Sequence, residues 1–403
     1  MMNKKIAVFT HFYVCNFGAN LQALSTSCYL KRNGWDPIFI NWVGYQSKIF
    51  GNVNEEQVKA HYSFANRHLN ISPELQNAEE IYDYLVKNEI FNVILGSDAV
   101  FALDTFVDRI NISKKGLKVK KSAPDKIFPN PFWLEFLVDD NRFKIAAMSV
   151  SSQNCFYHVL SSKIKARIKR CLNRFDYISV RDEWTQNMVK SLAGRDVDIT
   201  PDPVWAFNYN CEEILNERSN IQSLLEIKKP YVLLGFQNAY VSQTKKFLDD
   251  FIPKIEECGF QSIPLPFAFG YYNSSLYSKQ VELPLDALDW YRLIQESSGY
   301  IGYNMHPIIA SMHNNKPCIS IDNYGINFAK RINIRRSSKI YDIMSRMGRA
   351  KQCIEIRSFF REKMQSLDIV SMLKNYDIEE GRRIASVQHT SYNNMMNSIL
   401  KVF

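Results

Sequence analysis

The chain has 403 residues and a formal net charge of +9 at pH 7, with 46% hydrophobic and 23% charged residues. This length favours two domains over one core, and the residue balance is that of a fully folded globular protein. No stretch reaches the roughly 18 consecutive apolar residues of a membrane-spanning helix, and the apolar run after the first lysines is only strand-length. We therefore expect a cytoplasmic protein.

The spacing of the cysteines and of the basic residues excludes some classes of ligand. The eight cysteines never form a Cys-x-x-Cys pair, which argues against a zinc or redox site and predicts no metal. Without interleaved aromatic residues, the basic clusters do not predict nucleic-acid binding. They are either solvated faces or contacts with an anionic membrane surface. The clusters are Lys114, Lys115, Lys118, Lys120 and Lys121; Lys163, Lys165, Arg167, Lys169 and Arg170; and Lys330, Arg331, Arg335 and Arg336.

Strand-like and helical patterns alternate from the start of the chain, as in βαβ units with a parallel sheet. The segment 101–130 is irregular and lysine-rich, and we interpret it as a mobile insertion loop. In this half the expected strands are 5–12, 37–42, 91–95, 143–149, 177–180 and 197–200, and the expected helical segments are 20–33, 55–87 and 161–174.

A second alternating series begins near residue 230. Its expected strands are 231–235, 261–265, 300–303 and 316–321, its helices are 243–258, 286–297 with Asp286 as N-cap, and 307–313, and no strand is expected after 337. The predicted fold is α/β, with two Rossmann-like domains that have parallel sheets in a GT-B-like arrangement. The predicted units are an N-terminal domain at 1–210, a C-terminal domain at 225–365 and C-terminal helices at 366–403.

Ligands of open parallel sheets bind at the carboxyl ends of strands, so polar residues that follow strands are the site candidates. Asn16, Gly18 and Asn20 lie between the first strand and first helix, where backbone N–H groups can approach an anion; a tight turn alone also explains them. Gly96, Ser97 and Asp98 follow a buried strand. Ser97 and Asp98 can hydrogen-bond a sugar or cap the next helix.

Two cationic candidates follow later strands. Arg181 offers a planar fork for a carboxylate or phosphate, unless it forms an ion pair with Asp182 or Glu183. His306, which follows Asn304 at a junction between strand and helix, can act as a general acid or base or bind an anion, although a lone histidine is often structural.

The order of these motifs resembles the polysaccharide pyruvyl transferase family over roughly residues 5–328. The matching pieces are Asn16-x-Gly18-x-x-Leu21-Gln22-Ala23-Leu24, Gly96-Ser97-Asp98-x-Val100-Phe101, Pro131-Phe132-Trp133 leading into Lys144-Ile145-Ala146, Ser179-Val180-Arg181-Asp182-Glu183, Asp202-Pro203, and the segment from His306 to Pro317.

The resemblance implies transfer of a pyruvyl group from phosphoenolpyruvate to a sugar as a cyclic ketal, without a metal or other cofactor. It implies that His306 and Arg181 are catalytic. Arg181, Asn304 and His306 would bind the donor, together with Lys330 or Arg331 in place of the family's donor-binding lysine. We assign the acceptor side to Asn16, Gly18, Asn20, Gly96, Ser97 and Asp98.

Further expectations concern the partners and the competing functions. The acceptor would be a sugar in a surface polysaccharide or lipid-linked oligosaccharide, which suits a basic protein peripheral to the inner membrane face. A GT-B glycosyltransferase that uses a nucleotide sugar is the main alternative, because Asn304-Met305-His306-Pro307 departs from the family's Ser-Phe-His-Gly segment. A non-catalytic subunit of a polysaccharide assembly complex is the second.

Overall fold

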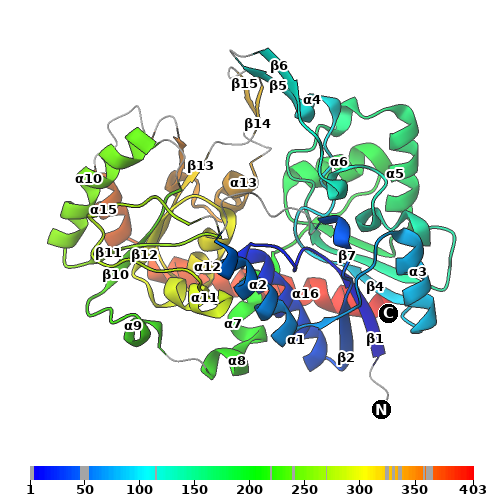
Figure 1. Ribbon diagram of the computed structural model, residues 1–403, viewed down its shortest axis with the longest axis horizontal. Coiled ribbons are helices and arrows are strands. Elements are labelled where there is room, and N and C mark those ends of the chain that lie inside the picture. The colour runs from blue at the N-terminus through cyan, green and yellow to red at the C-terminus, as the bar shows by residue number, and fades with distance from the viewer. Residues whose placement is uncertain are drawn as a thin grey trace.

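Two parallel β-sheets, one in each half of the chain, form the framework of the protein (Figure 1). The computed structural model describes residues 4–45, 54–113, 116–217, 220–237, 241–268, 270–322, 326–328, 332–334, 338–356, 359 and 366–403. The first sheet has the strand order β3-β2-β1-β4-β7-β8-β9, and all its pairings are parallel. Its strands are β1 (Lys4–Phe9), β2 (Trp35–Phe39), β3 (Asn70–Ile71), β4 (Asn92–Leu95), β7 (Lys144–Val150), β8 (Tyr177–Val180) and β9 (Asp198–Ile199).

The helices of the first half begin at polar caps that satisfy their free N–H groups. Asn16, Asn54, Asn77, Ser161 and Asp182 each accept a backbone N–H bond in the first turn of the helix that follows. These helices are α1 (Phe17–Arg32), α2 (Glu55–His68), α3 (Ala78–Lys87), α5 (Ser162–Arg174) and α6 (Glu183–Ala193).

The second sheet is smaller, with the parallel order β11-β10-β12-β13-β16. Its strands are β10 (Tyr231–Gly235), β11 (Gln261–Pro264), β12 (Gly299–Gly302), β13 (Cys318–Asp322) and β16 (Cys353–Glu355). Its main helices are α10 (Val241–Glu257), α11 (Ala287–Glu296), α12 (Met305–His313), α13 (Lys339–Arg346) and α15 (Ser366–Lys374). Asp286 caps α11 as expected. The predicted α/β class, with two Rossmann-like units in a GT-B-like arrangement, is confirmed.

Short strands are where the sequence-based expectations were wrong or incomplete. β16 joins the second sheet after residue 337, where no strand was expected. The expected loop at 101–130 contains α4 (Phe106–Arg109) and an antiparallel hairpin of β5 (Ile110–Ser113) and β6 (Gly116–Val119). A second hairpin pairs β14 (Ile326–Phe328) with β15 (Ile332–Ile334). Strands of three or four residues carry too little periodicity to be recognised.

Short helical turns form the segment between the two sheets, and the last helix of the chain packs back on the first half. η6 (Pro203–Ala206), α7 (Phe207–Asn210), α8 (Glu212–Asn216) and α9 (Ile221–Leu224) lead into the second half. At the end of the chain, α15 packs on α10, whereas α16 (Ile378–Val402) runs back across the molecule to β7 and β8 (Figure 1). Tyr392, Met395, Met396 and Ile399 of α16 are buried in the core of the first half. None of the described helices is long and apolar enough to cross a bilayer.

The first two helices also pack directly on the second half, which fixes one side of the boundary between the halves. The Gln57 side chain of α2 donates to the Leu285 carbonyl at 2.9 Å and accepts from the Leu285 N–H at 2.7 Å. Phe17 of α1 stacks on Trp290 of α11 with ring centroids 5.1 Å apart. His61 is buried beside Phe17 and hydrogen-bonds Asn20, and its Nε2 has no hydrogen-bond partner among the described residues.

The free energy of unfolding should therefore decrease in mild acid, because the buried His61 resists protonation. Burial lowers the pKa of His61 from 6.5 to about 4, and the charge of Asp286 only partly opposes this. Between these pH values the unfolded chain binds a proton that the folded chain excludes. The free energy of unfolding should therefore drop by about 3 kcal/mol as pH falls from 6.5 to 4. Urea titrations across this range should show a shallower drop for His61→Gln, which retains a donor for Asn20. Parallel curves for the two proteins would contradict this expectation.

Candidate active site

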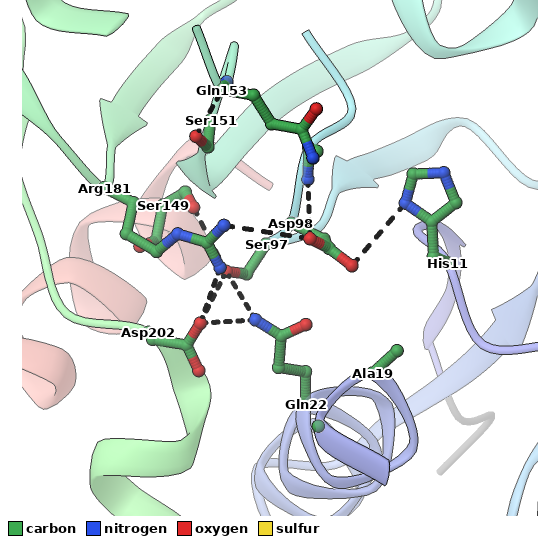
Figure 2. A network of polar contacts seen from close by, with 12 residues as sticks. His11, Ala19, Gln22, Ser97, Asp98, Ser149, Ser151, Gln153, Arg181 and Asp202 are labelled. Carbon is green, nitrogen blue, oxygen red and sulfur yellow. Dashed lines mark hydrogen bonds and ion pairs between the residues drawn. The ribbon is translucent and has the colours of Figure 1, made fainter. Parts of the chain in front are cut away.

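The carboxyl ends of five strands of the first sheet bring polar side chains to one edge, opposite the start of α12 from the second half. His11 follows β1, Ser97 and Asp98 follow β4, and Arg181 follows β8. Ser149 lies at the end of β7, and Asp202 lies beyond β9 (Figure 2). The sequence-based argument from strand ends therefore located this edge correctly.

The Arg181 guanidinium is at the centre of this cluster and is almost completely buried, with 1% of its side chain exposed. Its Nη1 donates to Asp202 Oδ2 at 2.8 Å, and its Nη2 lies 3.7 Å from Asp98 Oδ1 (Figure 2). Burial alone would lower the pKa of Arg181, but Asp202 and Asp98 outweigh it and raise that pKa, so the side chain stays cationic. The two ion pairs described for Arg181 are therefore with Asp202 and Asp98, whereas Asp182 caps α6 and accepts from Ser151.

Two nitrogen atoms of this buried cation donate no hydrogen bond within the described residues. The Nε and Nη2 atoms of Arg181 have no hydrogen-bond partner among the described residues. A buried donor without a partner costs free energy, and such groups are rare away from functional sites. Arg181 therefore has donors that an anionic ligand could satisfy.

Asp202 joins the two halves of the site. Its Oδ2 accepts from Arg181 and Gln22, and lies 3.7 Å from the Nε2 of His306, which comes from the second half. Burial would raise the pKa of Asp202, but His306 and Arg181 hold it below the ordinary range, so the carboxylate is charged. A single buried carboxylate thus connects the predicted arginine and histidine.

His306 lies in the first turn of α12 and rests against the first turn of α1. A Cβ atom on Gly18 would lie 2.0 Å from His306 Nδ1, so only glycine leaves room for the imidazole. The side chain is 12% exposed, and Nε2 has no hydrogen-bond partner among the described residues. Gly18, assigned to the acceptor from sequence, is thus the surface on which His306 packs.

Asp98 lies at the open side of the cluster, with 15% of its side chain exposed. His11 Nδ1 is 3.7 Å from its Oδ2, and His11 Nε2 is 3.2 Å from Asp125 Oδ2. Burial would raise the pKa of Asp98, but His11, Arg181, His306 and Lys339 outweigh it and lower that pKa.

Several residues with strained backbone conformations lie around the polar cluster at the carboxyl ends of the strands. Asp98, Ser149, Gln153 and Asn304 have φ values of 111°, 49°, 53° and 72°, which residues other than glycine rarely adopt. Such strain persists where the surrounding structure imposes it, and it is common at functional sites. Asn304 is exposed and makes no side-chain capping bond at the start of α12.

Lys339 is a cation of this site that the sequence analysis missed. It is the first residue of α13, after the N-cap Ser338. Burial and the charge of Arg181 lower the pKa of Lys339 overall, although Asp98, Asp182 and Asp202 oppose this change. Lys339 therefore interacts electrostatically with the charged residues of the cluster. A fixed spacing after His306 points instead to Lys330 and Arg331, which lie outside the described residues. The sequence signal that could have identified Lys339 is its position directly after Ser338, a serine able to cap the helix that follows.

The other predicted acceptor residues have local structural partners. Asn16 caps α1, and Asn20 is fully buried, where it donates to the Phe12 carbonyl and hydrogen-bonds His61. Gly96 packs its backbone against Thr10, and the Ser97 hydroxyl donates to the Ser149 carbonyl at 3.1 Å. Of these residues, the structure brings only Ser97 into the cluster around Asp202. Their acceptor-binding roles stay predictions.

The part of the chain that the structure describes contains no group of three or more His, Cys, Asp or Glu side chains placed to hold a metal ion. All eight cysteines are free thiols. The predicted absence of a metal cofactor stays a prediction.

The fold is shared with solved structures of other proteins. The chain superposes on UDP-GlcNAc 2-epimerase from Neisseria meningitidis bound to UDP-GlcNAc, with a TM-score of 0.57 and 9% identity over 98% of this chain and 99% of that one. For UDP-GlcNAc 2-epimerase from Methanocaldococcus jannaschii the TM-score is 0.52, with 12% identity over 95% and 98%. At this identity the likeness shows the shared two-sheet fold alone.

The family follows from the sequence. The profile of the polysaccharide pyruvyl transferase family matches residues 16–324, so the chain belongs to this family and is an enzyme of polysaccharide pyruvylation. The match contains every strand-end residue of the site from Ser97 to His306. None of the curated protein sequences compared with the chain matches it significantly.

Proposed function

We propose that the protein transfers the pyruvyl group of phosphoenolpyruvate to a sugar as a cyclic ketal. The observation that carries this proposal is the buried Arg181 cation, which has two nitrogen atoms without a hydrogen-bond partner among the described residues and is linked through Asp202 to His306. Lys339 adds a second basic side chain that interacts electrostatically with Arg181. A small donor with a carboxylate and a phosphate needs this arrangement of a planar fork, an ammonium and a nearby acid.

In the proposed reaction, His306 gives a proton to the methylene carbon of the donor. A sugar hydroxyl attacks the adjacent carbon, the bond from that carbon to the phosphate oxygen breaks, and a second hydroxyl closes the ketal. The two hydroxyls release two protons; one restores His306, and the other leaves with phosphate. We assign to Asp98, at the open side of the cluster, the role of accepting the proton of the attacking hydroxyl and passing it on to His306, with which it interacts electrostatically.

The contact between Gly18 and His306 gives a prediction about this reaction. Gly18→Ala should lower turnover by at least about tenfold, because the new Cβ displaces the imidazole, while alanine's helix propensity preserves stability. Steady-state kinetics of a double-mutant cycle with His306→Ala would test this. The alanine at position 18 should cost nothing further once His306 is absent. Additive losses would contradict a role through His306.

We propose a sugar of a lipid-linked oligosaccharide as the acceptor, modified at the cytoplasmic face of the membrane. The exposed lysines Lys163 and Lys169 on α5 support contact with anionic lipid, whereas Arg167 and Arg170 on the same helix form ion pairs with Glu135 and Asp139. Vesicle co-sedimentation should show binding that requires anionic lipid and weakens in Lys163→Glu/Lys169→Glu.

A glycosyltransferase with a nucleotide-sugar donor is the second candidate, because the fold is shared with an enzyme solved with UDP-GlcNAc. The test is phosphate release from phosphoenolpyruvate in the presence and absence of a lipid-linked oligosaccharide fraction. Release that depends on the fraction, with pyruvate recovered in the glycan, is the expected result. Release of UDP from UDP-sugars instead would favour the second candidate, and no turnover of either donor would favour a non-catalytic subunit.

A further inference from the structure

A cavity of about 430 Å³ opens between the two halves, beside the cluster around Arg181. From the first half it is lined by Asp104, Asp108, Lys126, Gln153 and Asn154, and from the second half by Lys339 at the start of α13. Its size lies in the range of about 300–1,000 Å³ that is usual for ligand pockets. None of the predicted acceptor residues lines it.

The side chains that line the cavity indicate which kind of ligand it could bind. The Asp104 carboxylate can accept hydrogen bonds, and Asp108 keeps Oδ1 for this because its Oδ2 accepts from Thr105. Lys126 can donate, and the amides of Gln153 and Asn154 can do both. A polyphosphate would meet repulsion from the carboxylates. A neutral molecule with many hydroxyl groups, each able to donate and accept, can satisfy all these side chains.

Two features hold Gln153 in place for such a ligand. Its backbone is in the left-handed region at φ 53°, and its N–H donates to Ser151 Oγ at 3.1 Å. Lys126 Nζ donates to Gln153 Oε1 at 3.3 Å, which leaves the amide NH₂ group to donate elsewhere. In Figure 2 the Gln153 side chain extends toward Asp98.

Lys339 joins the cavity to the reacting cluster. It lines the cavity and also interacts electrostatically with Arg181, Asp98 and Asp202. A sugar in the cavity would thus present hydroxyl groups to a donor held by Arg181, His306 and Lys339, with Asp98 at the boundary.

We infer that this cavity is the subsite for the acceptor sugar. Gln153, Asn154 and Asp104 would recognise the sugar as a neutral polyhydroxyl ring. The inference rests on the proposed function, since it supplies the acceptor for that reaction. It moves the acceptor away from Asn16 and Asn20, whose side chains are engaged at the first turns of α1.

Saturation-transfer NMR with methyl β-D-galactoside, methyl β-D-glucoside and methyl N-acetyl-β-D-mannosaminide would test this inference. At least one glycoside should bind the wild-type protein and bind about tenfold more weakly to Gln153→Asn/Asn154→Ala, which loses two neutral hydrogen bonds. Asparagine tolerates the left-handed backbone at position 153, so the double variant should fold. Asn394→Ala, at an exposed position of α16 away from the cavity lining, is the matched control and should bind like wild type.

Titration of each protein with phosphoenolpyruvate separates the two proposals. The affinity for phosphoenolpyruvate should be the same in the double variant and the wild type, because neither side chain belongs to the donor cluster. If no glycoside binds, or if glycosides bind the double variant and the wild type equally, the acceptor cavity is wrong even when phosphoenolpyruvate binds. If glycosides bind through Gln153 and Asn154 but phosphoenolpyruvate does not bind, the proposed donor fails while the sugar subsite stands.

Discussion

Replacing His306 with alanine should lower turnover by about a hundredfold to ten-thousandfold and leave the fold intact. In the proposed mechanism His306 supplies the proton that makes the donor electrophilic, and a positioned acid contributes a factor of this size. The side chain lies at the boundary between the halves, where it packs on Gly18 and not among the apolar side chains of either core, so its loss should leave both cores in place. Steady-state phosphate release and thermal unfolding would measure the two effects separately.

The matched control is His158→Ala. His158 is an exposed histidine of η5 (Tyr157–Val159) that contacts Tyr157 and Trp184. It should keep wild-type turnover. A His306→Ala protein with full turnover would remove the histidine from the mechanism, and one that fails to fold would show a structural role.

Arg181→Met should reduce the free energy of unfolding by about 3–5 kcal/mol, in addition to abolishing donor binding. The substitution leaves Asp202, which is completely buried, and Asp98 without their shared cation, and an uncompensated buried charge carries a cost of this size. Urea unfolding of the two proteins measures the difference directly.

Two comparisons make this prediction specific. Arg142→Met removes an arginine from an exposed ion pair with Asp140, and it should reduce the free energy of unfolding far less than Arg181→Met does. Arg181→Met/Asp202→Leu removes both buried charges and should recover part of the lost stability. Equal losses for Arg181→Met and Arg142→Met would show that the buried pair contributes no more than an exposed one.

The sequence predicted the architecture and the edge of the sheet because both follow from local patterns. Buried strands such as 91–95 and 231–235 are strongly apolar, and in a parallel sheet their ends meet at one edge. Ser97, Asp98, Arg181 and His306 could therefore be placed near one another from their positions after strands.

The centre of the site could not be predicted in the same way. Asp202 was part of a motif that marked the end of the first half, and nothing local shows that it accepts from Gln22, 180 residues earlier in the chain. Lys339 comes well after His306 in the sequence, and the spacing alone does not show that it interacts with the same cluster. Gly18 pointed to an anion-binding turn, whereas its missing Cβ makes room for an imidazole from the other half. These are long-range contacts, which a single sequence does not reveal.

The most direct test of the central claim is a calorimetric titration with phosphoenolpyruvate and, in parallel, UDP-GlcNAc. The wild-type protein should bind phosphoenolpyruvate saturably, and Lys339→Met should bind it at least about tenfold more weakly, because hydrogen bonds to charged groups contribute about 1.5–3 kcal/mol. UDP-GlcNAc should give no binding heat. Saturable binding of UDP-GlcNAc with no response to phosphoenolpyruvate would contradict the account.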